Sequence, residues 1–236
     1  MVGLSPRKLP RQARAQATFQ AIVDACGQML AAGPYDAVST NAVAERAGVS
    51  IGTLYEYFPN RESIVAALAA AACRRLVQRM ERAVSETRGM APFEGVEHLL
   101  GAGIEAMGAP ENAFKALMRE APFVLRLPAM KEAREALTAL CQSIRVASAG
   151  TLNLADPETD TWLISQMLFN AMLEIAFLET SEAERARYRR ELARLTCRMA
   201  LGHDLPPPQE SSRALPGDIR AKSDAARGGF GASGLP

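Results

Sequence analysis

Apolar residues recur along most of this chain at intervals of three and four positions, the spacing that places them on one face of an α-helix. The first such stripe lies within residues 11–32, and Gly33-Pro34 ends the helix that it predicts. The stripe consists of Phe19, Ile22, Val23, Cys26, Met29 and Leu30. No segment alternates apolar and polar residues in the manner typical of a β-strand. The pattern therefore predicts an all-α protein.

Glycine and proline residues divide the rest of the chain into further helical segments. Short helices are expected at about 40–47 and 51–58. Longer helical patterns follow at about 61–88, 93–108, 111–119, 129–149, 157–179 and 182–202. Residues 205–236 differ, because they are rich in proline and glycine and contain few large apolar residues. Such a segment cannot bury enough apolar surface to offset the entropy of ordering it, so we expect a disordered tail there.

Composition narrows the possible function classes. The 236 residues are 48% hydrophobic and carry a net charge of +1, which is ordinary for a globular protein. No apolar stretch is long enough to span a membrane, and the N-terminus lacks the apolar core of a secretory signal. Four widely spaced cysteines without a CxxC pair predict neither a zinc site nor a disulfide framework, and two histidines without a catalytic motif argue against an enzyme. We therefore expect a cytoplasmic, non-enzymatic protein without metal or cofactor.

The segment from Ser39 to Phe58, STNAVAERAGVSIGTLYEYF, has the outline of a helix-turn-helix. Ser39 or Thr40 can cap the first short helix, and Ser50 can cap the second. Gly48 ends the first helix in a tight turn. The residues expected to face inward are Val43, Ala44, Ala47, Val49, Leu54 and Phe58. The free N-terminal end of the second helix and its two tyrosines, which we expect to be exposed, suit insertion into the major groove of DNA.

This segment resembles the TetR family of bacterial transcriptional regulators, and the resemblance covers about residues 11–65. The matching residues are Thr40, Val43, Ala44, Ala47, Gly48, Val49, Ser50, Gly52, Thr53, Leu54, Tyr55, Tyr57, Phe58, Asn60, Arg61 and Glu62. The resemblance implies an all-α homodimer with an N-terminal DNA-binding domain. It also implies a C-terminal helical domain that dimerises and holds a pocket for a small molecule, whose binding releases the operator.

The resemblance further implies which side chains contact DNA. The positions that match phosphate contacts are Ser39, Thr40, Ser50, Tyr55 and Arg61. The positions that match contacts to base edges are Ile51, Gly52, Thr53 and Tyr57. A helix N-terminus favours anions, which agrees with phosphate contact at Ser39 and Thr40. Ile51 can offer only an apolar contact, for example to a thymine methyl group.

Charged residues near the motif leave alternatives open. The first 20 residues contain no acid and four basic residues, Arg7, Lys8, Arg11 and Arg14. This arm is either a solvated charged run or a basic arm that reaches phosphates or the minor groove. Glu56 on the second helix either accepts a hydrogen bond from a cytosine amino group or points away from DNA, because phosphate repels a carboxylate.

Large apolar residues are frequent between residues 93 and 179, and most of them must form a core. Polar residues spaced four apart interrupt the most apolar helix. They are exposed, line a dimer interface or supply the polar contacts of a pocket. A pocket of this composition suits a small hydrophobic molecule. The candidate ligand-binding residues are Met107, Phe114, Met118, Phe123, Trp162, Gln166, Asn170 and Glu174.

By the same resemblance, the helices at about 157–179 and 182–202 pair with their copies in a four-helix bundle. Tyr188, Leu192, Leu195 and Met199 form one apolar stripe, whose alternative role is packing within one subunit. A dimer would hold two recognition helices about 34–36 Å apart over a palindromic site.

Four regions are therefore predicted: a basic flexible arm (1–10), a helix-turn-helix domain (11–65), a ligand-binding and dimerisation domain (66–204) and the tail (205–236). The expected function is that of a repressor, associated with the bacterial nucleoid, which a small hydrophobic molecule releases from a palindromic operator in double-stranded DNA. The alternatives are an activator of the same fold and a helical scaffold that does not bind DNA. The dependence of binding on salt concentration distinguishes a regulator from a scaffold, because binding through phosphate contacts weakens steeply as salt rises.

Overall fold

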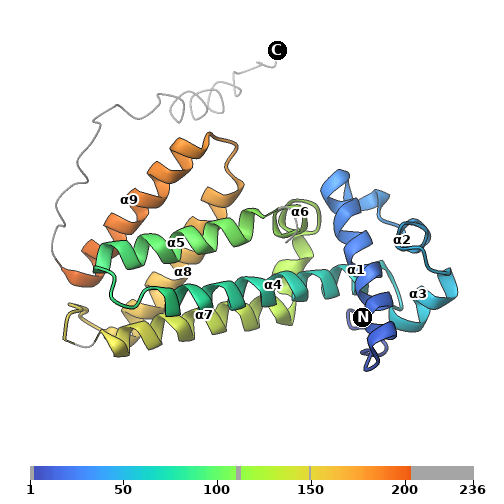
Figure 1. Cartoon of the computed structure of the whole chain (residues 1–236), viewed down its shortest axis with the longest axis horizontal. Coiled ribbons are helices and arrows are strands. Elements are labelled where there is room, and N and C mark those ends of the chain that lie inside the picture. Colours follow the sequence, from blue (N-terminus) through green and yellow to red (C-terminus); the bar gives the residue numbers. More distant parts are fainter. Residues whose placement is uncertain (1–2, 110–112, 149, 203–236) are drawn as a thin grey trace, which may run out of the picture. The chain divides into compact units, whose positions relative to one another are not determined.

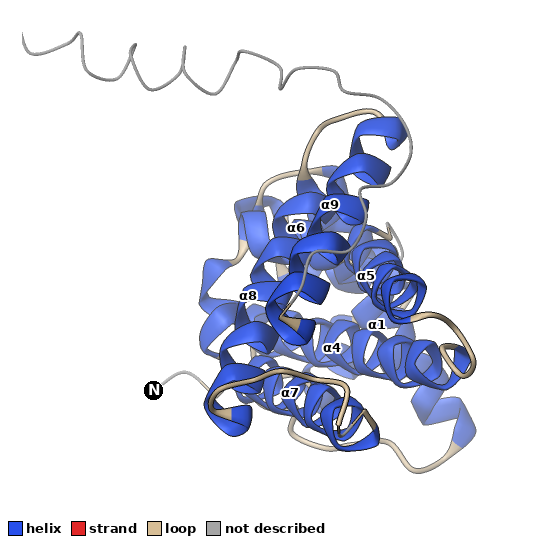
Figure 2. Ribbon diagram, turned by 90° about the vertical axis from the view of Figure 1, so that its left-hand side faces the viewer, coloured by secondary structure: helices blue, strands red, loops and turns tan. Residues whose placement is uncertain are grey.

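A computed structural model of the chain describes residues 3–109, 113–148 and 150–202, and the regular structure of these residues is entirely helical (Figures 1 and 2). The all-α expectation is confirmed. The helices are α1 (Ala13–Ala32), α2 (Thr40–Ala47), α3 (Ile51–Tyr57), α4 (Arg61–Glu86), α5 (Pro92–Gly108), α6 (Phe114–Glu120), α7 (Pro128–Ala147), α8 (Pro157–Phe177) and α9 (Glu182–Leu201). Short 3₁₀ helices at Tyr35–Ala37 and Pro122–Arg126 were not expected from the sequence. The predicted tail lies outside the described residues.

Polar side chains cap the N-terminal ends of α2, α3 and α4 at the positions that the sequence predicts. The Ser39 hydroxyl accepts a hydrogen bond from the Ala42 backbone N–H at 3.2 Å, which caps α2. The Ser50 hydroxyl accepts from the Thr53 N–H at 3.0 Å and caps α3 in the same way. At the start of α4, the side chain of Asn60 accepts from the N–H of the third helical residue at 2.8 Å. These caps fix where each of the three helices begins.

Helices α1, α2 and α3 pack around a common core at the N-terminal end of α4. Its largest fully buried residues include Ile22 and Leu30 of α1, Val43 of α2, and Leu54 and Phe58 at α3. The Phe58 ring lies 4.7 Å from the Phe19 ring, centroid to centroid. Each of these residues belongs to a stripe that the three- and four-residue spacing predicts.

Helix α4 extends from this core into the remaining helices, where it packs against α5 and α7 (Figure 1). Its 26 residues span about 39 Å at 1.5 Å per residue. Helix α8 packs against α5 and α7, and α9 packs against α5 and α8. Among the described residues, no helix is long and apolar enough to cross a membrane. One continuous helix therefore contributes to both groups of helices.

Candidate nucleic-acid interface and internal cavity

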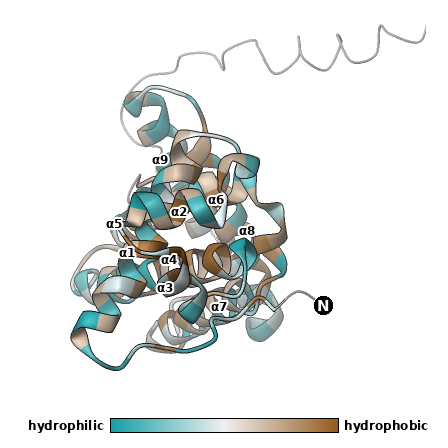
Figure 3. Ribbon diagram, turned by 90° about the vertical axis from the view of Figure 1, so that its right-hand side faces the viewer, coloured by the Kyte–Doolittle hydropathy of each residue, from teal (hydrophilic) through white to brown (hydrophobic). Residues whose placement is uncertain are grey.

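The turn between α2 and α3 sets the direction of α3. Gly48 has a left-handed backbone with φ of 66°, which a residue with a Cβ atom adopts only under strain. Its N–H donates to the Glu45 carbonyl at 3.1 Å, and the Val49 N–H donates to the Ala44 carbonyl at 3.0 Å. The turn thereby satisfies two of the last four carbonyl groups of α2. It leads into α3, a second short helix, and both α2 and α3 lie on the side of the molecule that faces the viewer in Figure 3.

The N-terminal turn of α3 has an open outer surface. Ile51 is 39% exposed although it is large and apolar. A Cβ atom at Gly52 would meet only the Ser50 hydroxyl, at 3.8 Å, so another surface could approach the backbone closely there. The Thr53 hydroxyl lies 2.8 Å from the Ser50 hydroxyl. This end of α3 therefore combines free backbone, hydroxyl groups and an exposed methyl-bearing side chain.

Hydroxyl groups from α2 and α3 meet beside this turn. The Tyr55 hydroxyl lies 3.2 Å from the Thr40 hydroxyl, and the Tyr55 side chain is 40% exposed. Ser39, also exposed, precedes Thr40 at the N-terminus of α2. Hydroxyl groups at a helix N-terminus are well suited to phosphate oxygens, because the helix dipole and free N–H groups favour negative charge.

Of the nine candidate contact residues, Tyr57 is buried and Arg61 contacts another part of the chain. Tyr57 is only 7% exposed, and its ring packs edge-on against Phe19 at 5.9 Å. The expectation that both tyrosines of α3 are exposed is therefore wrong for Tyr57. The reason is helical geometry, since position 57 follows Leu54 by three residues and shares its inward face. Arg61 lies 4.0 Å above the Tyr35 ring and donates to the Tyr35 carbonyl at 3.4 Å.

Residues 3–8 of the basic arm lie along the C-terminal end of α3. The Arg7 N–H donates to the Tyr57 carbonyl at 2.7 Å, and the Asn60 side-chain amide donates to the Gly3 carbonyl at 3.1 Å. The Lys8 ammonium group lies 2.8 Å from the Glu56 carboxylate, which raises the pKa of the lysine, mainly through this hydrogen bond. Glu56 therefore pairs with the arm, a contact that sequence reasoning did not find, although the two opposite charges were visible.

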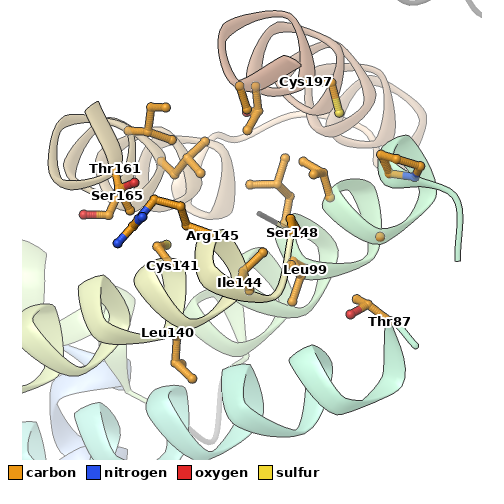
Figure 4. Close-up of a pocket in the computed structure, with 18 of the residues that line it drawn as sticks. Thr87, Leu99, Leu140, Cys141, Ile144, Arg145, Ser148, Thr161, Ser165 and Cys197 are labelled. Carbon is orange, nitrogen blue, oxygen red and sulfur yellow. The ribbon is translucent and has the colours of Figure 1, made fainter. Parts of the chain in front are cut away.

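A cavity of about 350 Å³ lies between α4, α5, α7, α8 and α9 (Figure 4). Most of the residues that line it are apolar, and burial raises the pKa of the Cys141 thiol in its wall to about 11. Arg145 of α7 is the one charged residue among the described residues of the lining. This combination of apolar walls and few polar groups is typical of small-molecule sites.

None of the eight candidate ligand-binding residues lines this cavity. Met107 and Phe114 are fully buried in the core, and Met118 and Phe123 pack against it. Trp162, Asn170 and Glu174 are exposed, and half-buried Gln166 donates to the Thr138 hydroxyl at 3.3 Å.

The polar row of α8 lies on a different face of that helix from the cavity. The α8 residues that line the cavity include Thr161, Ser165, Phe169 and Met172. Their spacings of four, four and three mark one helical face, which was the available sequence signal.

Apolar side chains also remain exposed on the last two helices. Trp162 is 53% exposed and Met167 is 54% exposed on α8. On α9, Leu195 and Met199 of the predicted apolar stripe are 40% and 38% exposed. The stripe is therefore only partly used for packing within the described part of one chain. Exposed apolar patches of this kind often mark interaction surfaces.

Residues 22–68 match the family model described as bacterial regulatory proteins of the tetR family. The repressor KstR of Rhodococcus jostii, named as an HTH-type transcriptional repressor, is 38% identical over 87 residues, which cover 36% of this chain and 39% of KstR. The fatty acid metabolism regulator protein of Bacillus subtilis is 32% identical over 68 residues, covering 29% of this chain and 35% of that protein. The matched segment thus spans little more than a third of these curated relatives.

Solved structures share the fold over a longer part of the chain. A protein from Mesorhizobium loti, described as a tetR-family transcriptional regulator, superposes with a TM-score of 0.64 at 18% identity and covers 80% of this chain and 99% of its own. The fatty acid degradation regulator FadR from Bacillus halodurans superposes with a TM-score of 0.61 at 18% identity, covering 78% of this chain and 96% of its own. At this identity the likeness shows the fold.

Proposed function

Because the N-terminal helix-turn-helix domain of this chain belongs to the tetR family of bacterial regulatory proteins, we propose that the protein is a ligand-responsive transcriptional repressor. In this proposal it binds a palindromic DNA operator as a homodimer, and a small hydrophobic molecule releases it. The observation that carries the proposal is the open N-terminal end of α3, held by a capped turn beside the hydroxyl groups of α2. Action on chromosomal DNA would place the protein in the cytoplasm, at the nucleoid.

We assign the DNA contacts by the position of each side chain. Ser39, Thr40, Ser50 and Tyr55 would contact phosphate groups, and Ile51, Gly52 and Thr53 would approach base edges. Tyr57 is omitted because it is buried. Arg61 stacks on the Tyr35 ring and donates to the Tyr35 carbonyl, so we assign it instead to holding the link between α1 and α2.

A second copy of the chain would cover the exposed apolar residues of α8 and α9, forming a four-helix bundle. Such a dimer would present two α3 helices, whose separation must be about 34–36 Å to enter successive major grooves on one side of DNA. In this proposal, residues 11–65 form the DNA-binding domain and residues 66–204 form the ligand-binding and dimerisation domain.

Helix α4 offers a physical link between the two sites. It begins at the Asn60 cap beside α3, and its residues Met80 and Val84 line the cavity with the adjacent Thr87. A ligand that shifts this end of α4 would change the spacing of the α3 helices and thereby lower operator affinity. The names of two similar proteins refer to fatty acid metabolism or degradation, which agrees with an apolar ligand.

Fluorescence anisotropy on duplex DNA tests the proposed function. We expect tight binding to DNA from the region upstream of the protein's own gene, with two chains per duplex, and weak binding to a scrambled duplex. Contact with six or more phosphates should lower affinity by about 10³-fold or more between 50 and 200 mM salt. Absence of binding to either duplex, or binding unaffected by salt, would favour the scaffold alternative.

Replacing Glu56 with glutamine should strengthen DNA binding. The variant removes a negative charge from α3 and frees Lys8, which pairs with Glu56 in the structure. We therefore expect higher affinity for scrambled and operator duplexes alike, and a salt dependence steeper by about one phosphate contact. Salt titrations of the anisotropy signal measure both.

The matched control is Lys8→Ala alone and together with Glu56→Gln. If Lys8 supplies the added contact, Glu56→Gln should no longer steepen the salt dependence when Lys8 is absent. An unchanged salt dependence in the single variant Glu56→Gln would mean that the Lys8–Glu56 pair lies away from DNA.

A further inference from the structure

The cavity contains one cationic group within largely apolar walls, and this contrast defines the ligand that it would bind. We propose that the cavity binds an amphiphilic carboxylate, with the carboxylate on Arg145 and the apolar chain along the walls formed by α5, α7 and α8. The proposal rests on the ligand-binding role proposed above and narrows it from any hydrophobic molecule to an anionic one.

Arg145 has no partner in the described part of the chain. It lies half-buried in the last turn of α7 and reaches toward Thr161 and Ser165 of α8 (Figure 4). Its Nε atom is buried without a hydrogen bond, and no carboxylate of the described residues lies within 4.0 Å of its guanidinium group. The Nε atom of Arg134 on the same helix is also buried without a hydrogen bond, but the Arg134 guanidinium group lies 5.3 Å from the centre of the Phe169 ring, a contact that Arg145 lacks among the described residues.

A neutral ligand would leave this guanidinium group poorly solvated. When a ligand fills an apolar cavity it displaces the water that would otherwise solvate a charged group in the wall. An isolated charge in such surroundings is costly, whereas a carboxylate restores both charge balance and hydrogen bonds. The guanidinium fork matches a carboxylate with two parallel N–H···O bonds.

The hydroxyl groups in the lining do not compete for this role. Their protons are directed to backbone carbonyl oxygen atoms, so they offer lone pairs but no free donor. These hydrogen bonds run from Thr87 to Val84 at 2.8 Å, Thr151 to Ser148 at 2.7 Å, Thr161 to Pro157 at 2.6 Å, Ser165 to Trp162 at 2.7 Å and Thr196 to Leu192 at 2.7 Å. The Ser148 hydroxyl makes no such bond within the described residues and lies one helical turn after Arg145.

Apart from the weakly donating thiols of Cys141 and Cys197, the side-chain donors available to a ligand among the described lining residues are therefore the Arg145 guanidinium and the Ser148 hydroxyl. A group that only accepts hydrogen bonds and carries negative charge satisfies both, and an ionised carboxylate is such a group. An ammonium group would meet the guanidinium charge without a described carboxylate to offset it. These donors therefore favour a negatively charged ligand over a neutral or positively charged one.

The walls and the size of the cavity define the rest of the ligand. Leu99, Leu137, Leu140 and Ile144 line the same cavity as Arg145 without offering polar side-chain atoms. A volume of about 350 Å³ is near the lower end of the range for small-molecule sites. We therefore expect a single alkyl chain of medium length, for which decanoate is a suitable probe.

Isothermal titration calorimetry of the full-length protein with decanoate, decanol and decyltrimethylammonium tests the proposal. The three probes share one alkyl chain and differ in charge. We expect decanoate to bind the wild-type protein about tenfold to a hundredfold more tightly than decanol, and the ammonium probe to bind most weakly. Equal affinity for decanoate and decanol, or no binding of decanoate, would overturn the proposal.

Substitutions in α7 then test whether Arg145 causes the preference for decanoate over decanol. Arg145→Met keeps the length of the side chain but should abolish the preference for decanoate, whereas Arg145→Lys should retain part of it. Lys131→Met removes an exposed positive charge of α7 and should leave the preference unchanged. Thermal melting confirms that each variant is folded, and an unchanged preference in Arg145→Met would overturn the proposal.

Operator binding by the ligand-free protein separates this inference from the proposed function. A protein that binds its operator but does not prefer decanoate contradicts the anionic ligand and leaves the DNA-binding role intact. A protein that prefers decanoate through Arg145 but binds no DNA supports the ligand assignment and contradicts the proposed regulator.

Discussion

Replacing Phe58 with alanine should destabilise the N-terminal helices and abolish DNA binding with them. The Phe58 side chain is fully buried, and its ring lies 4.7 Å from the Phe19 ring of α1. Because Phe58 follows α3 directly and precedes the Asn60 cap of α4, its ring joins α1 to the junction of α3 and α4. Removal of a buried phenylalanine side chain lowers the free energy of unfolding by about 3–5 kcal/mol. Many domains are stable by only about 5–15 kcal/mol, so this loss is large.

Chemical denaturation followed by circular dichroism measures this loss as a lower denaturant midpoint. The matched control is Tyr55→Phe, three positions earlier, which removes only the hydroxyl group beside Thr40 on the surface of α3. We expect this control to change the free energy of unfolding by less than about 1 kcal/mol while weakening operator binding. Wild-type stability in Phe58→Ala would show that the ring does not hold α1 against α3.

Helix positions could be predicted from the sequence because each helix has local signals. Ser39, Gly48 and Ser50 fix the ends of α2 and the start of α3 through contacts within four residues along the chain. The apolar stripe of α1 is likewise visible as spacing alone. The short 3₁₀ helix at Pro122–Arg126 was missed, since fewer than two turns show too few repeats for a period to be recognised.

The cavity could not be predicted in the same way, because a cavity depends on which side chains fail to fill the space between helices. Met107 and Phe114 have the large apolar side chains of a ligand site and yet complete the core. Nothing in the sequence distinguishes Arg145 from the surface arginines of the chain. Only the packing of α8 against α7 places it in the cavity wall.

Contacts between distant segments explain the remaining differences at the candidate DNA interface. The pairing of Lys8 with Glu56 joins residues 48 positions apart, and no local pattern specifies it. Tyr57 differs from its prediction for another reason. Both the outline of the helix-turn-helix and the resemblance placed it on the exposed side, and it is buried. Its position three residues after Leu54 explains the burial, because the two side chains share one helical face.

Replacing Gly52 with aspartate should abolish operator binding and leave the fold intact. Gly52 is the second residue of α3, where a carboxylate is favoured by the helix dipole, and aspartate favours the helix more than glycine does. The new Cβ atom would meet only the Ser50 hydroxyl, at 3.8 Å, which is an ordinary contact. We therefore expect the stability to stay unchanged or rise by up to about 1 kcal/mol.

On DNA, the same aspartate would lie among phosphate oxygens and acceptor groups of the bases. Like charges in contact cost several kcal/mol, so operator affinity should fall by about 100-fold or more in anisotropy titrations. Gly52→Asn adds a side chain of nearly equal size without charge, and the ratio of the two affinities isolates the charge effect from the loss of close backbone approach. Wild-type affinity in Gly52→Asp would mean that the N-terminal end of α3 does not face DNA. A fall in affinity without loss of stability would place the readout at this end, because the substitution favours the helix and acts against DNA alone.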